Sequence, residues 1–92
     1  MIRHVVLWTF REGEEAKAEE FLTRLKALDG VIPQIRHMEI HRAVGGDSSA
    51  SLFVDFDSLE DLEQYKNDPR HKAVSALCKS IRTARASLDY VM

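Results

Sequence analysis

The 92-residue sequence predicts a single α+β domain in which one antiparallel sheet carries helices on one face, in the order β-α-β-β-α-α-β. Two observations lead to this prediction. The spacing of apolar residues switches along the chain between two and about 3.6 residues. A Gly- and Ser-rich turn at 45–49 joins two consecutive strand-like segments, which indicates a hairpin. No repeat, linker or low-complexity tract divides the chain, so we expect one domain over residues 1–92.

The composition argues against several classes of protein. Thirteen Lys and Arg against fifteen Asp and Glu give a net charge of −2, which disfavours binding to nucleic acid or an anionic membrane. We expect no transmembrane segment, because no run of about 18 apolar residues exists, and no signal peptide. The single cysteine, Cys78, excludes an internal disulfide and indicates a reducing, cytoplasmic setting.

The first expected strand, residues 2–10, is apolar on both faces. Its two faces would carry, respectively, Ile2, His4, Val6, Trp8 and Phe10, and Arg3, Val5, Leu7 and Thr9. Because both faces are apolar, we expect both to be covered. Helices could cover one face, and the other needs something that this short chain lacks.

Residues 14–29 change to a helical spacing, and Gly30 and Pro33 are typical of a helix end. Segments 35–44 and 50–56 then read as the two strands of the hairpin.

Ser58 is a good N-cap for a short helix, which Pro69 ends. A third helix follows, with Lys72, Lys79 and Arg82 on its wet side and an apolar stripe formed by Ala73, Val74, Leu77, Cys78 and Ile81. Residues 84–92 close the domain as a strand.

This order predicts a ferredoxin-like sandwich whose sheet has one bare face. That face would carry Val5, Leu7, Phe53 and Val91. A second copy packing sheet to sheet would bury it, so we expect a homodimer.

Four segments, IRHVVLWTF, LKALDGVIPQIRHMEI, VDFDSLEDLEQYKNDPRHKAV and the terminal DY, together resemble the stress-responsive dimeric α/β-barrel (Dabb) family over nearly the whole chain. The resemblance implies a ferredoxin-like protomer whose sheet pairs with a partner's sheet to close a barrel. A plant branch, the olivetolic acid cyclase-type polyketide cyclases, closes a linear poly-β-ketone by aldol-type condensation. The positions similar to its catalytic residues are Tyr65, His71 and His4, whereas Asp68 stands where the branch commonly has His.

The residues themselves suggest the same chemistry. His71 could act as general base or acid, Tyr65 as the hydroxyl donor to a developing enolate, and His4 as a helper. Alternatively, His71 packs at the start of the third helix, Tyr65 is a core residue with a wet tip, and His4 is a buried structural histidine. No cofactor is implied. We expect a small, largely apolar carbonyl substrate in a pocket walled by Val6, Trp8, Phe21, Leu25 and Leu77.

Other polar groups suggest less. His37, Glu39 and His41 share a strand face, but its ends lie about 13 Å apart, so a solvated face is favoured over a metal site. Four cations, Lys72, Lys79, Arg82 and Arg85, could attract an acidic ligand, but we interpret them as a solvated face as well. We expect Cys78 to be buried and inert.

Three functions stay open. The first is cofactor-free enolisation, aldol-type cyclisation or isomerisation. The second is a non-catalytic, stress-related oligomer whose function is its stable assembly. The third is a cofactor-free monooxygenase, for which Trp8 and His71 would also be suited.

Overall fold

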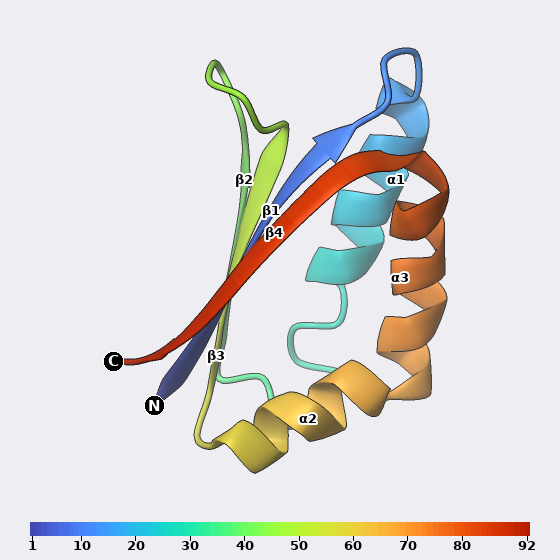
Figure 1. Cartoon of the computed structure of the whole chain (residues 1–92). Helices are drawn as coiled ribbons and strands as arrows, with labels where there is room; N and C mark the ends of the chain where they lie inside the picture. The colour runs from blue at the N-terminus through green and yellow to red at the C-terminus, as the bar shows by residue number, and fades with distance from the viewer.

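One antiparallel sheet and three helices form the two layers of the computed structural model, which describes all 92 residues (Figure 1). The strands lie in the order β2-β3-β1-β4. Their bounds are β1 Ile2–Phe10, β2 His37–Arg42, β3 Ala50–Phe56 and β4 Arg82–Val91, and those of the helices are α1 Glu15–Lys26, α2 Leu59–Asn67 and α3 Pro69–Ile81. The expected ferredoxin-like α+β fold is therefore confirmed.

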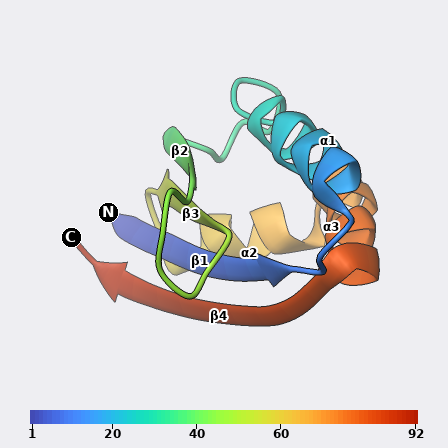
Figure 2. The ribbon, with the colours of Figure 1, turned by 90° about the horizontal axis from the view of Figure 1, so that it is seen from above.

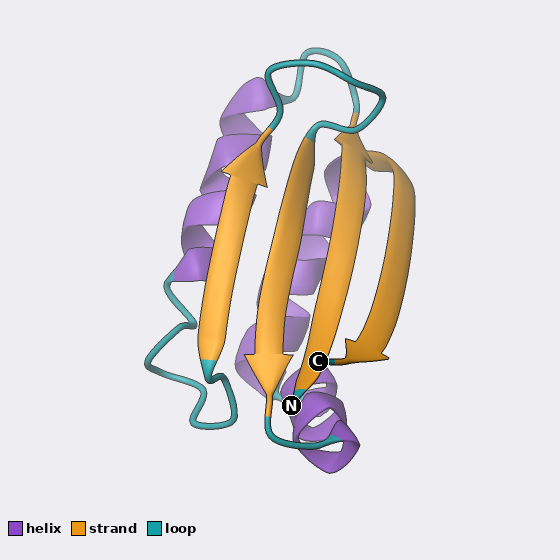
Figure 3. Cartoon of the chain, turned by 90° about the vertical axis from the view of Figure 1, so that its left-hand side faces the viewer, coloured by secondary structure: helices purple, strands orange, loops and turns teal.

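All three helices cover the same face of the sheet (Figure 2). Nineteen buried apolar residues fill the space between the two layers. Trp8 lies at the centre of an aromatic group in this core, with its ring centroid 5.1 Å from that of Phe21 in an edge-to-face arrangement. The other face of the sheet carries no helix (Figure 3).

Local signals predict most element boundaries. The strands expected at 2–10 and 50–56 are confirmed, and the Ser58 hydroxyl accepts the backbone N–H of Asp61 at 3.1 Å as an N-cap. The first helix, however, ends at Lys26 instead of continuing to residue 29. The chain then follows tight turns, in which Gly30 has a φ of 91°. Its apolar stripe continues there because Leu28 and Ile32 still point into the core.

The expectation for the last strand needs two corrections. β4 begins at Arg82 instead of residue 84. Val91 pairs with Ile2, so it lies on the helix side of the sheet and not beside Val5 on the bare face. The partner of Val5 is Leu88, which is 63% exposed.

The bare face is therefore apolar in the middle. Leu7, Leu88 and Tyr90 are exposed on it, and Val5 and Phe53 are half-buried. Ala73, expected in the apolar stripe of the third helix, is exposed. None of the three helices is long and apolar enough to cross a membrane.

Candidate functional site

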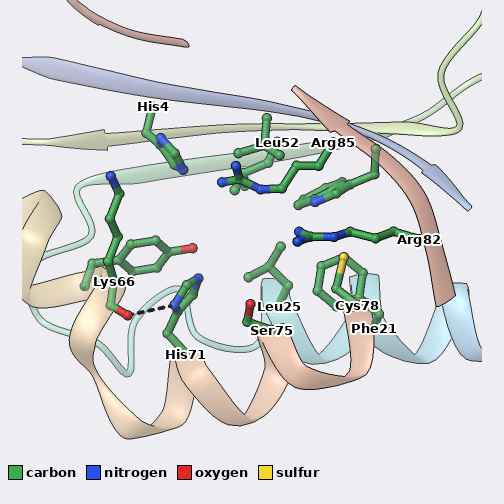
Figure 4. Close-up of a pocket in the computed structure, with 13 residues that line it drawn as sticks. His4, Phe21, Leu25, Leu52, Lys66, His71, Ser75, Cys78, Arg82 and Arg85 are labelled. Atoms are coloured by element: carbon green, nitrogen blue, oxygen red, sulfur yellow. Dashed lines mark hydrogen bonds between the residues drawn. The ribbon is translucent and has the colours of Figure 1, made fainter. Parts of the chain in front are cut away.

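Three elements bring His4, Tyr65 and His71 to one cavity between the sheet and the helices. His4 lies on the inner face of β1, Tyr65 lies in the last turns of α2, and His71 lies in the first turn of α3. The ring centroids of Tyr65 and His71 are 4.3 Å apart. The three residues line a cavity of about 100 Å³ (Figure 4). Tyr65 and His71 thus converge, although six residues separate them along the chain.

The junction between α2 and α3 determines where His71 lies. Asp68 follows the last turn of α2, and its backbone N–H donates to the Tyr65 carbonyl at 3.2 Å. The Asp68 carboxylate in turn accepts the backbone N–H of Arg70 at 2.8 Å and so caps α3. Pro69 occupies the first position of α3, where its missing N–H costs nothing. One residue therefore ends one helix and starts the next, and it turns His71 back toward Tyr65.

The Tyr65 hydroxyl is buried and has no hydrogen-bond partner in the chain. Burial raises the pKa of this phenol well above its usual range, against a small opposing effect of the Arg85 charge. Tyr65 therefore stays protonated and has an O–H bond to donate. A buried unpaired hydroxyl costs about 1–3 kcal/mol of stability, so it stands out in an otherwise apolar core.

His71 is neutral at pH 7. Burial lowers its pKa, and His4 and Arg85 act in the same direction, while the hydrogen bond to the Lys66 carbonyl and the Asp68 charge oppose them. The Nδ1 of His71 lies 3.4 Å from this carbonyl oxygen. Because a carbonyl can only accept, this contact favours the tautomer with the proton on Nδ1 and leaves the lone pair on Nε2.

His4 forms a side-chain pair with Asp89, its direct neighbour on β4. Burial lowers the pKa of His4, and the carboxylate of Asp89 partly offsets this effect. The Nδ1–H of His4 donates a hydrogen bond to this carboxylate, which leaves the lone pair on Nε2 and orients the ring. Asp89 was not among the candidate residues, because its pairing with His4 depends on strand register.

Most of the expected pocket wall lines the cavity. Val6, Trp8, Phe21 and Leu25 do so, whereas Leu77 does not and packs half-buried against the core instead. A helical turn places Leu77 and Cys78 in different directions, and Cys78 is the one that faces the cavity. As expected, Cys78 is buried, and this burial raises the pKa of its thiol.

Two of the four cations interpreted as a solvated face also line the cavity, although Arg85 is exposed and Arg82 is half-buried. Arg82 and Arg85 line the cavity, as do Leu52, Lys66 and Ser75, which the sequence did not single out. Figure 4 shows both side chains extending from β4 into the cavity, with the guanidinium of Arg85 beside His4 and that of Arg82 farther along, toward Cys78. The reason for this position is a change of register in β4.

The polar face of β2, which carries His37, Glu39 and His41, is solvated, as expected. His37 and His41 both contact the carboxylate of Glu39, at 2.9 and 3.3 Å, and all three side chains are at least 42% exposed. No group of three metal-ligating side chains occurs in the chain.

Comparisons with solved structures support the fold. A dimeric protein of unknown function with a ferredoxin-like fold, from Bacteroides fragilis, is 26% identical, with a TM-score of 0.90 over 99% of this chain and 95% of that chain. The hydroxynitrile lyase of Passiflora edulis is 12% identical, with a TM-score of 0.88 over 99% of this chain and 92% of that chain.

A candidate antibiotic biosynthesis monooxygenase from Nitrosomonas europaea is 11% identical, with a TM-score of 0.88 over 100% of this chain and 98% of that chain. No curated protein sequence matches the chain. The family model of the stress responsive A/B barrel domain, Dabb, matches residues 2–92. The chain therefore belongs to the Dabb family.

Proposed function

We propose that this protein catalyses cofactor-free acid–base chemistry on a small carbonyl compound. The reaction begins with removal of a proton next to the carbonyl and leads to enolisation, aldol-type closure or isomerisation. The observation that carries this proposal is the free, buried hydroxyl of Tyr65 beside the neutral His71 ring at one cavity. Tyr65 is a donor without an acceptor, and a carbonyl oxygen is the acceptor that such chemistry supplies.

The roles follow from the protonation states. The Nε2 lone pair of His71 takes the α-proton, and the Tyr65 hydroxyl donates a hydrogen bond to the enolate oxygen that forms. The proton then returns from the imidazolium to carbon, for isomerisation, or to the oxygen of the newly formed alkoxide, for aldol closure. His4, oriented by Asp89, lies across the cavity as a second proton carrier. Each step conserves protons within the site.

The size of the cavity limits the substrate. About 100 Å³ is less than the 300 Å³ or more of a typical small-molecule pocket. An engineered cavity of about 150 Å³ holds benzene. The cavity therefore favours a small substrate over a long one. Cyclisation of a long poly-β-ketone, as in the olivetolic acid cyclase-type branch, is the less favoured member of the proposed reactions.

The two other functions make different demands on the site. A purely structural assembly would gain stability by filling the cavity and pairing the Tyr65 hydroxyl. The second candidate function is a cofactor-free monooxygenase, because the fold is similar to that of a candidate monooxygenase. Trp8, which would suit such a reaction, also lines the cavity. Oxygen consumption on addition of a quinol would support that possibility against acid–base catalysis.

We also propose that the protein is a homodimer formed by its bare sheet face, since the Bacteroides fragilis protein of the same fold is dimeric. Burying Leu7, Leu88 and Tyr90 would satisfy the apolar character of both faces of the sheet. The single buried cysteine suits a reducing, cytoplasmic compartment.

Deuterium exchange tests the proposed chemistry. The wild-type protein should accelerate incorporation of deuterium from D₂O into acetone or 2,4-pentanedione, above the rate in buffer, as measured by ¹H NMR. His71→Gln and Tyr65→Phe should each lower this rate by about 100-fold or more. The matched control is Arg24→Gln, which changes an exposed side chain on α1, away from the cavity and from the bare sheet face.

Tyr65→Phe also separates chemistry from folding. Since the hydroxyl has no partner, its removal should leave the free energy of unfolding unchanged or raise it by about 1 kcal/mol, as measured in urea. Exchange that survives in His71→Gln at the wild-type rate would rule out the assignment of the base.

A further inference from the structure

The wall of the cavity is positively charged, although the chain as a whole is not. Its lining residues include Lys66, Arg82 and Arg85 but no Asp or Glu, in a chain whose net charge is −2. Two carboxylates compensate the charge of Lys66, since its Nζ lies 3.7 Å from the Glu63 carboxylate and 3.9 Å from that of Asp89. The two arginines are the charges at this cavity that no carboxylate compensates.

The lack of a partner sets these two arginines apart from most others. Of the eight arginines in the chain, five form ion pairs with carboxylates, namely Arg3, Arg24, Arg36, Arg42 and Arg70. Arg82 forms no ion pair and has only the Cys78 thiol as a side-chain neighbour, and Arg85 contacts only the Ser87 hydroxyl at 3.4 Å. A guanidinium group has five N–H donors, so both side chains retain nearly all of their binding capacity.

An irregularity in β4 brings the two guanidinium groups to the same side. In a regular strand, residues three apart point to opposite faces. Here Phe10 pairs with Arg82 whereas Thr9 pairs with Ala84, so Thr83 is an extra residue in the strand. Such a bulge re-aims the side chains beside it. As a result, both Arg82 and Arg85 line the cavity, which regular alternation would forbid.

Arg85 is also close to the reacting groups. Its positive charge acts on the pKa of Tyr65, His71 and His4 at once. Figure 4 shows its guanidinium beside His4, and that of Arg82 farther along the cavity, toward Cys78. The cavity thus has a cationic wall on β4 that runs past His4, with Tyr65 and His71 on the helix side.

We propose that Arg82 and Arg85 bind a carboxylate, so that the substrate is a small oxo acid and not a neutral, apolar carbonyl compound. This inference rests on the proposed function and revises the expected substrate class. Guanidinium groups match the planar, two-oxygen geometry of a carboxylate. They would also aid the chemistry, because an enolate formed next to a carboxylate carries a second negative charge that nearby cations stabilise.

Two probes that differ only in charge test this proposal. Acetoacetate carries a carboxylate, and acetoacetamide replaces it with a neutral amide of nearly the same size. Binding to the wild-type protein is followed by chemical-shift titration in ¹H–¹⁵N NMR spectra, which also report whether each variant is folded. We expect acetoacetate to bind about tenfold or more tightly than acetoacetamide.

The variants assign the preference to the two arginines. Arg82→Gln and Arg85→Gln should each weaken acetoacetate binding about tenfold and leave acetoacetamide binding unchanged. Arg85→Lys, which retains the charge but not the planar fork, should lose less than Arg85→Gln. The control is Arg24→Gln, since Arg24 lies on the exposed side of α1. Equal affinity for the two probes, or no binding of acetoacetate, would overturn the proposal.

The results also distinguish the proposed carboxylate subsite from the proposed acid–base reaction. If ketone exchange depends on His71 but acetoacetate is not preferred, the carboxylate subsite is wrong and the acid–base function stands. If acetoacetate binds through both arginines but no exchange is catalysed on it or on 2,4-pentanedione, the subsite stands and the proposed reaction is wrong.

Discussion

Tyr65 shows how one side chain can be part of the core and of a site. Its ring packs against Phe56, with the centroids 5.0 Å apart, and against His71, while its hydroxyl stays unpaired. Tyr65 lies on the apolar side of α2, which explains why its ring is buried in the core. Nothing in the core uses the hydroxyl, so its presence in place of Phe points to a ligand that accepts from it.

The lowered pKa of His71 has a consequence for stability. A histidine with a lower pKa in the folded than in the unfolded state binds fewer protons when folded, at pH values between the two. Stability is therefore greatest above the ordinary value of 6.5 and falls as the pH drops below it. His4 acts in the same direction.

We predict that the wild-type protein loses urea stability between about pH 7.5 and pH 5.5, and that His71→Gln loses less over the same interval. Lys66, His4, Asp68, Arg85 and Tyr65 surround this histidine and are kept unchanged. His41→Gln is the matched surface variant. An identical pH dependence in wild type and His71→Gln would contradict the proposed protonation state of His71.

At the scale of the elements, Asp68 links the position of His71 to helix capping. Its carboxylate both caps α3 and pairs with Arg70, and this guanidinium lowers the pKa of Asp68 to about 2. The carboxylate thus stays charged over the whole working range of pH. His71 follows three residues later, so the cap controls where the imidazole lies.

Asp68→Ala should lower the midpoint of thermal unfolding by several degrees and reduce ketone exchange, because the first turn of α3 loses its cap. Asp68→Asn retains a side-chain oxygen that accepts from the backbone, so we expect it to keep most of both properties. Calorimetry and the exchange assay measure the two variants side by side. Equal losses in Ala and Asn would show that the charge, and not the cap, matters.

At the scale of the whole molecule, the bare sheet face explains why β1 is apolar on both sides. Its inner residues face the helices, and its outer residues Val5 and Leu7 lie beside Leu88 and Phe53. The flanking pair of Arg3 and Asp55, joined by two hydrogen bonds of 2.8 and 2.9 Å, borders this apolar centre. An apolar centre with a polar border is the usual composition of a dimer interface.

Leu88→Glu should therefore convert a dimer into a monomer, as measured by sedimentation equilibrium, because two buried carboxylates would face each other across a two-fold interface. The matched control is Leu59→Glu, since Leu59 on α2 is 61% exposed and Leu88 is 63% exposed. A monomeric wild-type protein, or a Leu88→Glu variant that is still dimeric, would exclude this face as the interface.

The sequence by itself determined the type and order of the elements and much of the site. Apolar spacing is a local property, so it predicts β1, β3 and all three helices, and it places His4 and Trp8 on one face. The spacing from Tyr65 to His71 across a Pro break left their convergence open, and the structure places their ring centroids 4.3 Å apart.

The tertiary structure alone decided which polar groups meet. Asp89 reaches His4 because β4 pairs with β1, and Arg82 and Arg85 reach the cavity because a bulge at Thr83 breaks the alternation of β4. Register and bulges depend on the pairing of strands that are distant along the chain, and no local period encodes them. For this reason the candidate acid–base residues could be named from the sequence, whereas the place of Arg82 and Arg85 at the cavity could not.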